Sequence, residues 1–420
     1  MEFPAKAFRA GGCLIAFVLA VSILSDWPLL RASASQEQNK TEKSTKPPES
    51  EKQAKKDLRV EAASALPAVL WRDPGDIASL DLLNGAGGAK DAPNPDADYL
   101  FIDEDMGGTS TKFYVRDTNA VKWLVKLGPE ARTETAATRL VWAMGYFTDE
   151  DYFLPRIHVQ GLPKLRRKMF GASSKTGIVP NVRLERQVEG GKKLENWGWF
   201  DNPFVGTREL NGLRVLMGLI SNWDLTTQNN KVYVVEQERH YVVSDLGATF
   251  GKTGWPPSHV PLLPHATKDV LKDYEHARFI RATTGDTLTL QMHTTAPFFV
   301  RCFDHKYFNK YREAKRVEQD IPILDAQWIG GLLAQLTPKQ IRDAFRAAGL
   351  EPEESDAFAR VVEKRIAALN QLRSQSTNLH QQHCPRVTPD SSRSFFACIA
   401  RLQRLPQGRA KAGRIPPACT

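Results

Sequence analysis

Two short stretches on either side of a hairpin decide the fold of this chain. Residues 222–229 read NWDLTTQN, and residues 244–247 read SDLG. The first stretch follows apolar residues at helical spacing, and the second follows two runs of strand-forming residues. The order is therefore a helix, an Asp-x4-Asn loop, a hairpin and an Asp-x-Gly turn.

This order suits phosphoryl transfer. Asp224 would orient an acceptor hydroxyl and take its proton, while Asp245 and the amide oxygen of Asn229 would hold Mg²⁺ on a triphosphate. Gly247 would let the backbone turn sharply beside the metal. The alternative is an ordinary loop in which Asp and Asn side chains cap the backbone.

A lysine and a glutamate upstream extend the pattern. Lys126 ends a predicted strand at 121–127, and Glu134 lies in a predicted helix at 129–144, on the same face as apolar side chains. A buried carboxylate needs a partner, and a lysine that contacts the α- and β-phosphates would serve. Glu130, one turn earlier, is a rival for this pairing.

A glycine turn precedes both residues. It lies between predicted strands at 99–103 and 113–116. Exposed backbone N–H groups in such a turn, with a lysine beside them, would cover phosphates. The alternative is an ordinary hairpin turn. The turn residues are Gly107, Gly108, Thr109 and Ser110, followed by Lys112.

The order of Gly loop, Lys, Glu, Asp-x4-Asn and Asp-x-Gly resembles the protein-kinase-like fold. Residues 222–229 look most like the catalytic loop of the HipA-type and phosphoinositide-type atypical kinases. The resemblance covers about 95–375 and implies an α+β fold of two lobes. A strand-rich N-lobe would occupy about 95–195, and a helix-rich C-lobe about 196–375.

The resemblance also implies roles and cofactors. ATP and Mg²⁺ would bind, Lys126 would contact the phosphates, and Glu134 would position Lys126. Asp224 would be the catalytic base, with Asn229 and Asp245 as metal ligands and the glycine turn as phosphate loop. The chain departs from typical protein kinases because it has no His-Arg-Asp, no G-x-G-x-x-G and no Ala-Pro-Glu.

The segments outside this domain have distinct compositions. Residues 1–34 combine basic residues, a short apolar run and an Ala-x-Ala pattern, which is typical of a signal peptide cleaved after about Ala34. An uncleaved membrane anchor is the alternative. Residues 35–57 are predicted to be a disordered linker, 58–94 an N-terminal extension and 376–420 a basic, cysteine-containing tail.

Composition limits the function classes. With 41% hydrophobic and 25% charged residues among 420, the chain is neither disordered throughout nor a multi-span membrane protein. The net charge of +9 is concentrated in the tail, which suggests a solvated segment or one that contacts a membrane surface, and does not call for nucleic acid. Three hypotheses follow. One is an exported phosphotransferase with an unknown acceptor, another is a pseudokinase that only binds nucleotide, and the third is an envelope-associated structural protein.

The cysteines allow a test of export. The mature chain would hold Cys302, Cys384, Cys398 and Cys419, and disulfides persist in oxidising compartments. We expect at least one disulfide, with Cys384–Cys398 the first choice and Cys302 and Cys419 as a further pair. Closing the shorter loop would contribute about 3 kcal/mol. Mass spectrometry of non-reduced, alkylated protein from its native host checks this, and four alkylated cysteines would contradict it.

Overall fold

The strand-rich lobe is a barrel of five strands. The structure is a computed structural model that describes residues 49–187, 193–254, 265–293 and 305–383. Antiparallel pairs join the strands in the order β2-β3-β4-β6-β5, and parallel pairing of β2 with β5 closes the barrel. The strands are β2 (Asp98–Asp105), β3 (Lys112–Arg116), β4 (Lys122–Leu127), β5 (Asp151–Gln160) and β6 (Ile178–Arg186).

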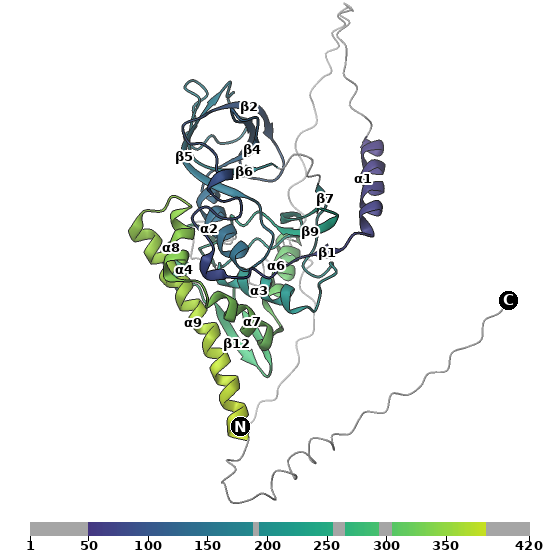
Figure 1. Ribbon diagram of the computed structural model, residues 1–420, viewed down its shortest axis with the longest axis vertical. Helices are drawn as coiled ribbons and strands as arrows, with labels where there is room; N and C mark the ends of the chain where they lie inside the picture. The colour runs from purple at the N-terminus through teal and green to yellow at the C-terminus, as the bar shows by residue number, and fades with distance from the viewer. Residues whose placement is uncertain (1–48, 188–192, 255–264, 294–304, 384–420) are drawn as a thin grey trace, which may run out of the picture. The chain divides into compact units, whose positions relative to one another are not determined.

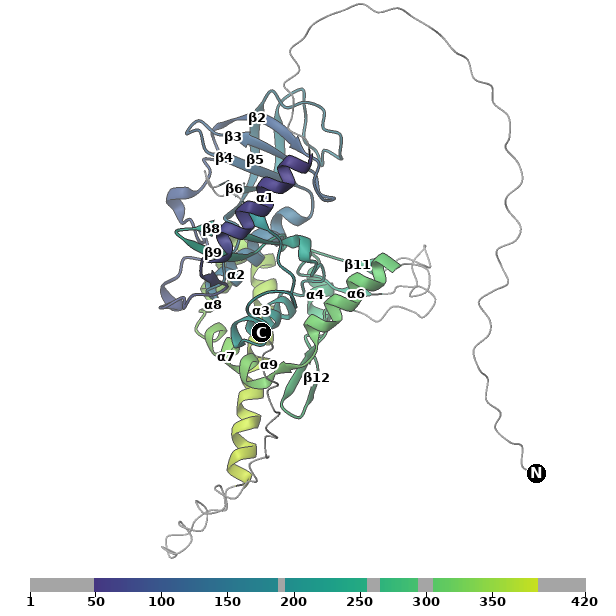
Figure 2. The ribbon, with the colours of Figure 1, turned by 90° about the vertical axis from the view of Figure 1, so that its right-hand side faces the viewer.

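Alternating apolar side chains fill the barrel, as the period of two in a strand requires. The interior of the barrel includes Tyr99, Phe113, Trp123 and Leu184, all nearly inaccessible to solvent. Figures 1 and 2 show the barrel strands gathered at one end of the ribbon, away from helices α7 and α9.

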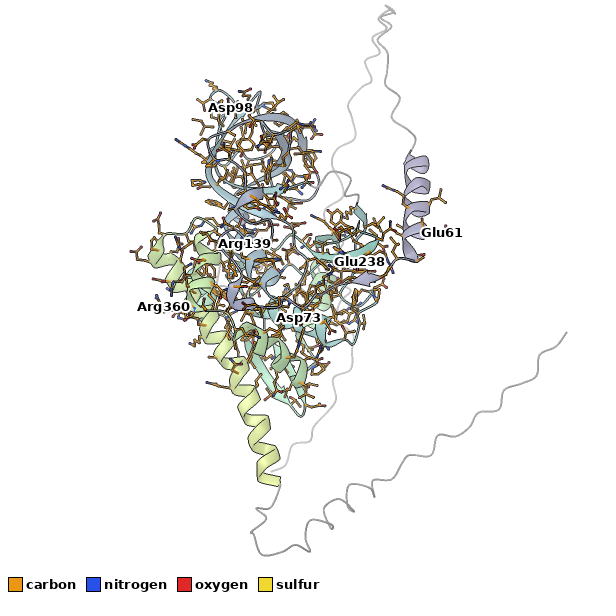
Figure 3. The ribbon with its side chains drawn as sticks, in the orientation of Figure 1. Glu61, Asp73, Asp98, Arg139, Glu238 and Arg360 are labelled. Atoms are coloured by element: carbon orange, nitrogen blue, oxygen red, sulfur yellow. The ribbon has the colours of Figure 1, made fainter. Side chains whose placement is uncertain are left out.

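Helix α2 (Glu130–Ala143) connects β4 to β5 and packs between the barrel and α8 (Pro338–Arg346). It starts one residue later than predicted, directly after Pro129. From its last turns, Arg139 (labelled in Figure 3) donates a 2.6 Å hydrogen bond to the carbonyl oxygen of Asp151. The helix is therefore fixed to the start of β5.

The second lobe is dominated by helices around one apolar core. Its core helix, α3 (Arg208–Leu219), is almost wholly buried, and Thr207 caps it through a hydrogen bond from the Leu210 amide. Thr337 and Gln340 form a capping box at the start of α8. The other helices are α4 (Leu271–His276), α6 (His305–Glu318), α7 (Ile323–Leu333) and α9 (Pro352–His383), with a short helix η3 (Thr227–Asn229).

Short sheets complete this lobe. The predicted hairpin forms as β8 (Asn230–Val235) and β9 (Glu238–Val243), within a sheet ordered β1-β9-β8-β7. The strands β1 (Ala68–Val69) and β7 (Lys193–Glu195) flank the hairpin. In one smaller sheet β10 (Thr253–Gly254) pairs with β11 (His265–Ala266). In another, β13 (Thr287–Leu290) lies between β12 (Ile280–Thr284) and β14 (Ile321–Pro322). The α+β fold of two lobes, strand-rich then helix-rich, is confirmed.

The N-terminal extension belongs to the core of the second lobe. Leu70, Ile77 and Leu82 are buried there, and β1 pairs in parallel with β9. Short helices η1 (Ile77–Ser79) and η2 (Ala89–Asp91) follow β1. The side chain of Gln340 donates hydrogen bonds to the carbonyl oxygens of Ile77 and Leu80, at 2.7 and 2.9 Å. The extension is thereby fixed to α8.

Two predicted boundaries need correction. Helix α1 (Glu49–Ser64) occupies the end of the stretch predicted to be disordered, because Glu, Lys and Ala are strong helix formers even where few residues are apolar. Helix α9 continues through 376–383, into the predicted tail, since no glycine or proline interrupts it before Pro385. The predicted signal peptide and all five cysteines lie outside the described residues.

Within the described ranges, no helix combines the length and apolar character needed to cross a bilayer.

A tight contact at Gly145 gives a stability test. Gly145 has φ +87°, and a Cβ there would lie 2.0 Å from the Arg72 carbonyl oxygen. We expect Gly145→Ala to lower the free energy of unfolding by about 3 kcal/mol or more, because strain and a backbone clash add. Gly161→Ala is the control, since Gly161 has φ +71° with nothing within 4 Å, and should cost about 1 kcal/mol. Urea denaturation measures both, and equal losses would contradict the clash.

Candidate functional site

Lys126 lies at the centre of the site. On β4 it is paired with Lys112 of β3 on one side and with Arg183 of β6 on the other. The Lys126 side chain is 3% exposed. A buried ammonium must have counter-charges.

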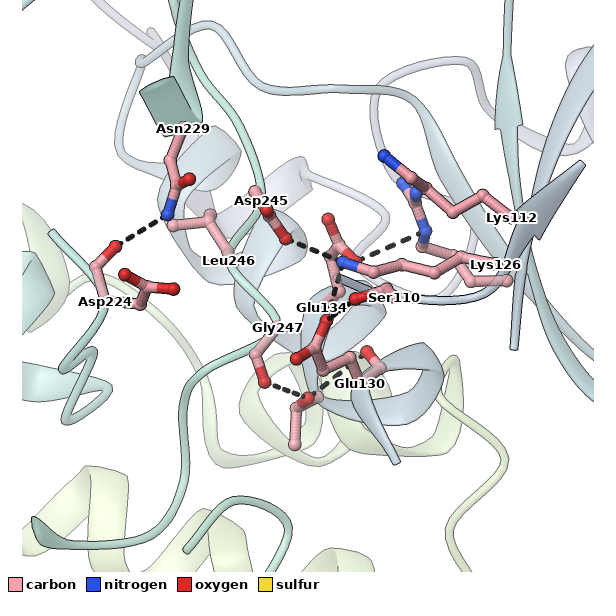
Figure 4. A network of polar contacts seen from close by, with 12 residues as sticks. Ser110, Lys112, Lys126, Glu130, Glu134, Asp224, Asn229, Asp245, Leu246 and Gly247 are labelled. Atoms are coloured by element: carbon pink, nitrogen blue, oxygen red, sulfur yellow. Dashed lines mark hydrogen bonds and ion pairs between the residues drawn. The ribbon is translucent and has the colours of Figure 1, made fainter. Parts of the chain in front are cut away.

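Three carboxylates supply the counter-charges of Lys126 (Figure 4). The Lys126 Nζ lies 2.8 Å from Glu134 Oε2, 2.9 Å from Glu130 Oε2 and 2.6 Å from Asp245 Oδ1. Glu130 and Glu134 are one turn apart on α2, so they face the same lysine. The choice between them, which the sequence left open, is resolved in favour of both.

The charges of this cluster shift one another's protonation. Burial by itself would lower the pKa of Lys126, but Glu134, Asp245 and Glu130 together outweigh it and raise that pKa above its ordinary value. Burial likewise favours the neutral form of Asp245, and the charge of Lys126 overrides it and lowers the pKa of Asp245. The ammonium and the Asp245 carboxylate are therefore both ionised at neutral pH.

Helix α2 is also held from its other sides. Thr133 Oγ1 donates a 2.7 Å hydrogen bond to the carbonyl oxygen of Gly247, and Arg183 Nε lies 3.4 Å from Glu134 Oε2. The last residue of the Asp-x-Gly turn thus contacts the helix, while the first, Asp245, contacts Lys126 of β4. The position of Glu134 is set by a strand lysine, a strand arginine and the neighbouring lobe.

The Asp-x-Gly turn differs from its predicted geometry. Asp245 itself has φ +52°, an unusual conformation for a residue with a side chain. Gly247 is required for a different reason, because a Cβ there would lie 2.7 Å from Cβ of Glu130. The glycine therefore permits close approach to α2, and the left-handed residue of the turn is the aspartate.

The Asp-x4-Asn loop is closed by its own hydrogen bonds. Asn229 Nδ2 donates to the Asp224 carbonyl oxygen at 2.7 Å, and the Asp224 amide donates to Asn222 Oδ1 at 3.0 Å. The first bond occupies the nitrogen of the Asn229 amide. Its oxygen is the atom of that group suited to a hard cation.

One cavity of about 780 Å³ brings the predicted residues together. Every residue proposed from the sequence for catalysis, nucleotide or metal binding lines it. These residues are Gly107, Gly108, Thr109, Ser110, Lys126, Glu134, Asp224, Asn229 and Asp245. Their roles remain predictions, whereas their convergence on one cavity is a property of the structure.

The rest of the cavity wall is unexpectedly polar. Lys231 Nζ lies 3.2 Å from Asp149 Oδ2 and 3.5 Å from Glu185 Oε1, and all three residues line the cavity. Arg183 pairs with Glu185 at 3.1 Å and with Asp151. Burial opposes the charge of Glu185, yet Lys231 and Arg183 lower the pKa of Glu185 to about 2. Sequence reasoning missed this network, because its members come from three separate segments.

A histidine that sequence reasoning also missed supports the Asp-x4-Asn loop. His293 Nε2 lies 2.6 Å from the carbonyl oxygen of Trp223, and Nδ1 lies 2.9 Å from Glu318 Oε1. A carbonyl oxygen only accepts, so Nε2 carries the proton of the first bond. The residue before Asp224 is thereby tied to α6. No local motif around His293 signals this contact.

The oxygen donors at one end of the cavity suit Mg²⁺. Asp245 and Asn229 offer a carboxylate and an amide oxygen, and Mg²⁺ in phosphoryl-transfer sites takes one or two carboxylates together with phosphate oxygens. Elsewhere in the described ranges, as here, no group of three or more His, Cys, Asp or Glu is arranged to hold a metal ion alone. One carboxylate and one amide oxygen fit a metal whose remaining ligands are phosphate oxygens.

Comparisons with known proteins give distant likenesses only. No protein-family model and no curated protein matches the sequence. Among solved structures, the chain is similar to the Helicobacter pylori proinflammatory kinase CtkA, with TM-score 0.39 and 11% identity, over 68% of this chain and 99% of that one. It is also similar to the amicoumacin kinase hAmiN in complex with AMP-PNP, Ca²⁺ and Ami, with TM-score 0.19 and 10% identity, over 77% and 99%. Likenesses this weak carry no functional argument.

The Lys126 cluster predicts a pH-dependent loss of stability. Lys126→Met should lower the free energy of unfolding by about 3 kcal/mol or more at pH 7, because buried carboxylates lose their shared cation. Without that cation the folded-state pKa values of the carboxylates rise, so the variant loses stability as pH increases. The difference in free energy of unfolding between the variant and wild type should therefore be largest near pH 8 and shrink towards pH 4.

Lys112→Met is the matched control. Lys112 lines the same cavity, but it is partly exposed and lies 3.5 Å from its partner Asp105. Lys112→Met should lower the free energy of unfolding by about 1 kcal/mol or less. Urea denaturation across this pH range measures all three proteins, and equal losses in the two variants would contradict a structural role for the Lys126 cluster.

Proposed function

We propose that this protein is an ATP- and Mg²⁺-dependent phosphotransferase of the kinase-like type. The observation that carries the proposal is Lys126, which contacts Glu134 of α2 and Asp245 of the other lobe at once. The glycine turn, Asp224 and Asn229 line the same cavity. This constellation provides a cation for phosphates, oxygen ligands for a metal and a carboxylate for the acceptor.

The chemistry divides among the side chains. The ammonium of Lys126 would bind phosphate oxygens, and Glu134 with Arg183 behind it would keep that ammonium in place. Asp224 would accept a hydrogen bond from the acceptor hydroxyl and then its proton. A bound Mg²⁺ would neutralise charge on the β- and γ-phosphates, held by Asp245 and Asn229.

Asp245 has to serve two cations in this scheme. Its Oδ1 lies on Lys126, while about half of its side chain is exposed. The second oxygen can reach a metal without breaking the ion pair. Nucleotide binding would then add a phosphate to Lys126, which weakens the pull of Lys126 on Asp245 and favours the metal contact.

The acceptor, the location and the closer family remain proposals from the sequence. We propose that the protein acts outside the cytoplasm on a hydroxyl of a protein, lipid or small molecule, with the basic tail at a membrane surface. The HipA-type and phosphoinositide-type resemblance rests on residues 222–229 alone. A pseudokinase would bind nucleotide without transferring phosphate, so turnover separates it from the enzyme.

Asp245→Ala tests metal-dependent binding. We expect the variant to lose Mg²⁺-dependent nucleotide affinity while its melting temperature changes little, because Lys126 keeps Glu130 and Glu134 as partners. Isothermal titration calorimetry with Mg·AMP-PNP measures the affinity. Asp98→Ala is the control, since Asp98 contacts His158 and Gln160 and none of these three residues lines the cavity. Wild-type affinity in Asp245→Ala would remove this residue from the site.

Asp224→Asn tests the proposed base. The amide keeps the size of the side chain but cannot take a proton, so turnover should fall by about 10²-fold or more while nucleotide affinity stays within a few-fold. Transfer of radiolabelled γ-phosphate in an autophosphorylation screen and calorimetry provide the two readouts. Equal losses in affinity and turnover would identify Asp224 as a metal ligand or a structural residue.

A further inference from the structure

Arg167 lies against the tip of the glycine turn. Its guanidinium donates hydrogen bonds to the carbonyl oxygens of Met106 at 2.7 Å and Gly108 at 2.6 Å, and to that of Ser110. The three acceptors alternate along the backbone. One side chain therefore fixes the orientation of three peptide groups in a single loop.

That orientation has a consequence for the loop's N–H groups. In a trans peptide the N–H is directed opposite to the carbonyl. The N–H of Thr109 shares its peptide with the Gly108 carbonyl, so it is directed away from Arg167. Residues 107–110 line the cavity and Arg167 does not. The N–H of Thr109 is therefore directed to the cavity side of the loop, whereas the N–H of Gly107 donates to Asp105 Oδ1 at 2.7 Å.

Arg167 is itself held in place by a short segment, residues 166–168. The Glu104 carboxylate accepts hydrogen bonds from the backbone amides of Arg166, at 3.1 Å, and Arg167, at 3.4 Å. Thr111 Oγ1 donates a hydrogen bond to the Lys168 carbonyl oxygen at 2.9 Å. Strand β2 and the residue directly before β3 thus each contribute an anchor. The guanidinium is positioned without help from any ligand.

We infer that Arg167 is a positioning residue that orders the 106–110 loop as a phosphate-binding surface. The loop has only two glycines and no G-x-G-x-x-G pattern, so it needs an external group to hold its peptides in one orientation. A planar guanidinium donates from several N–H groups at fixed angles, which a lysine cannot match. This inference rests on the proposed nucleotide-dependent function.

Three variants test it by calorimetry with two probes, Mg·AMP-PNP and adenosine. Arg167→Met should weaken Mg·AMP-PNP binding about tenfold or more and leave adenosine binding unchanged, because only phosphates contact the loop. Arg166→Met is the matched control. It removes the same charge from the neighbouring residue, whose contact with Glu104 is made by the backbone, and should change affinity less than threefold. Arg167→Lys keeps the charge and should resemble Arg167→Met.

The outcomes separate this inference from the proposed function. If Arg167→Met binds the triphosphate as tightly as Arg166→Met, or if Arg167→Lys matches wild type, the positioning role is overturned and the proposed function stands. A parallel loss of adenosine affinity would also overturn it, since the defect would then be in the fold. Wild-type protein that binds the triphosphate but transfers no phosphate defeats the proposed function alone. Failure of wild type to bind the triphosphate overturns both.

Discussion

A buried ammonium group that must be neutralised underlies the arrangement of this molecule. Lys126 extends from a barrel strand into a space where water is scarce, and an unpaired charge there would cost several kcal/mol. Its partners come from helix α2 and from the turn after β9. Satisfying one lysine thus fixes a helix and a loop of the second lobe relative to the barrel.

A second buried cation, on the neighbouring strand β6, also requires counter-charges. Arg183 is as buried as Lys126 and pairs with Glu134, Asp151 and Glu185. Glu134 is therefore shared between two cations, which leaves α2 little freedom to move outward. In a phosphotransferase such sharing would keep the nucleotide site assembled before any ligand arrives. That is preorganisation achieved by electrostatics and not by apolar packing.

The polar character of the cavity follows from these pairs. Among the described residues, two apolar side chains line it, Leu124 and Ala248, whereas Asp149, Glu185 and Lys231 form an ion-paired group on the same wall. A ligand that enters this space meets hydrogen-bonding groups along most of its length. Such a site selects by polar complementarity more than by shape.

Local sequence determined a large part of this protein. Periodicity identified β2, β3, β4, the β8–β9 hairpin and helices α2 and α3 within a few residues, because strand and helix patterns depend on near neighbours. The spacing of Asp224, Asn229 and Asp245 also placed them on loops beside that hairpin. The sequence analysis missed the helix at 49–57 and its continuation at 376–383, because few apolar residues recur there at helical spacing.

Only the tertiary structure decided which side chains meet. Glu130 and Glu134 are both plausible partners for Lys126 in the sequence, and the helix face brings both to it. Arg167, Arg183 and His293 carry no motif, because their partners are distant along the chain and are chosen by strand register and lobe packing. The spacing of residue types along the chain indicates local conformation, so the helices and strands could be predicted. The pairing of buried charges depends on the whole fold, so the contacts that organise the site could not.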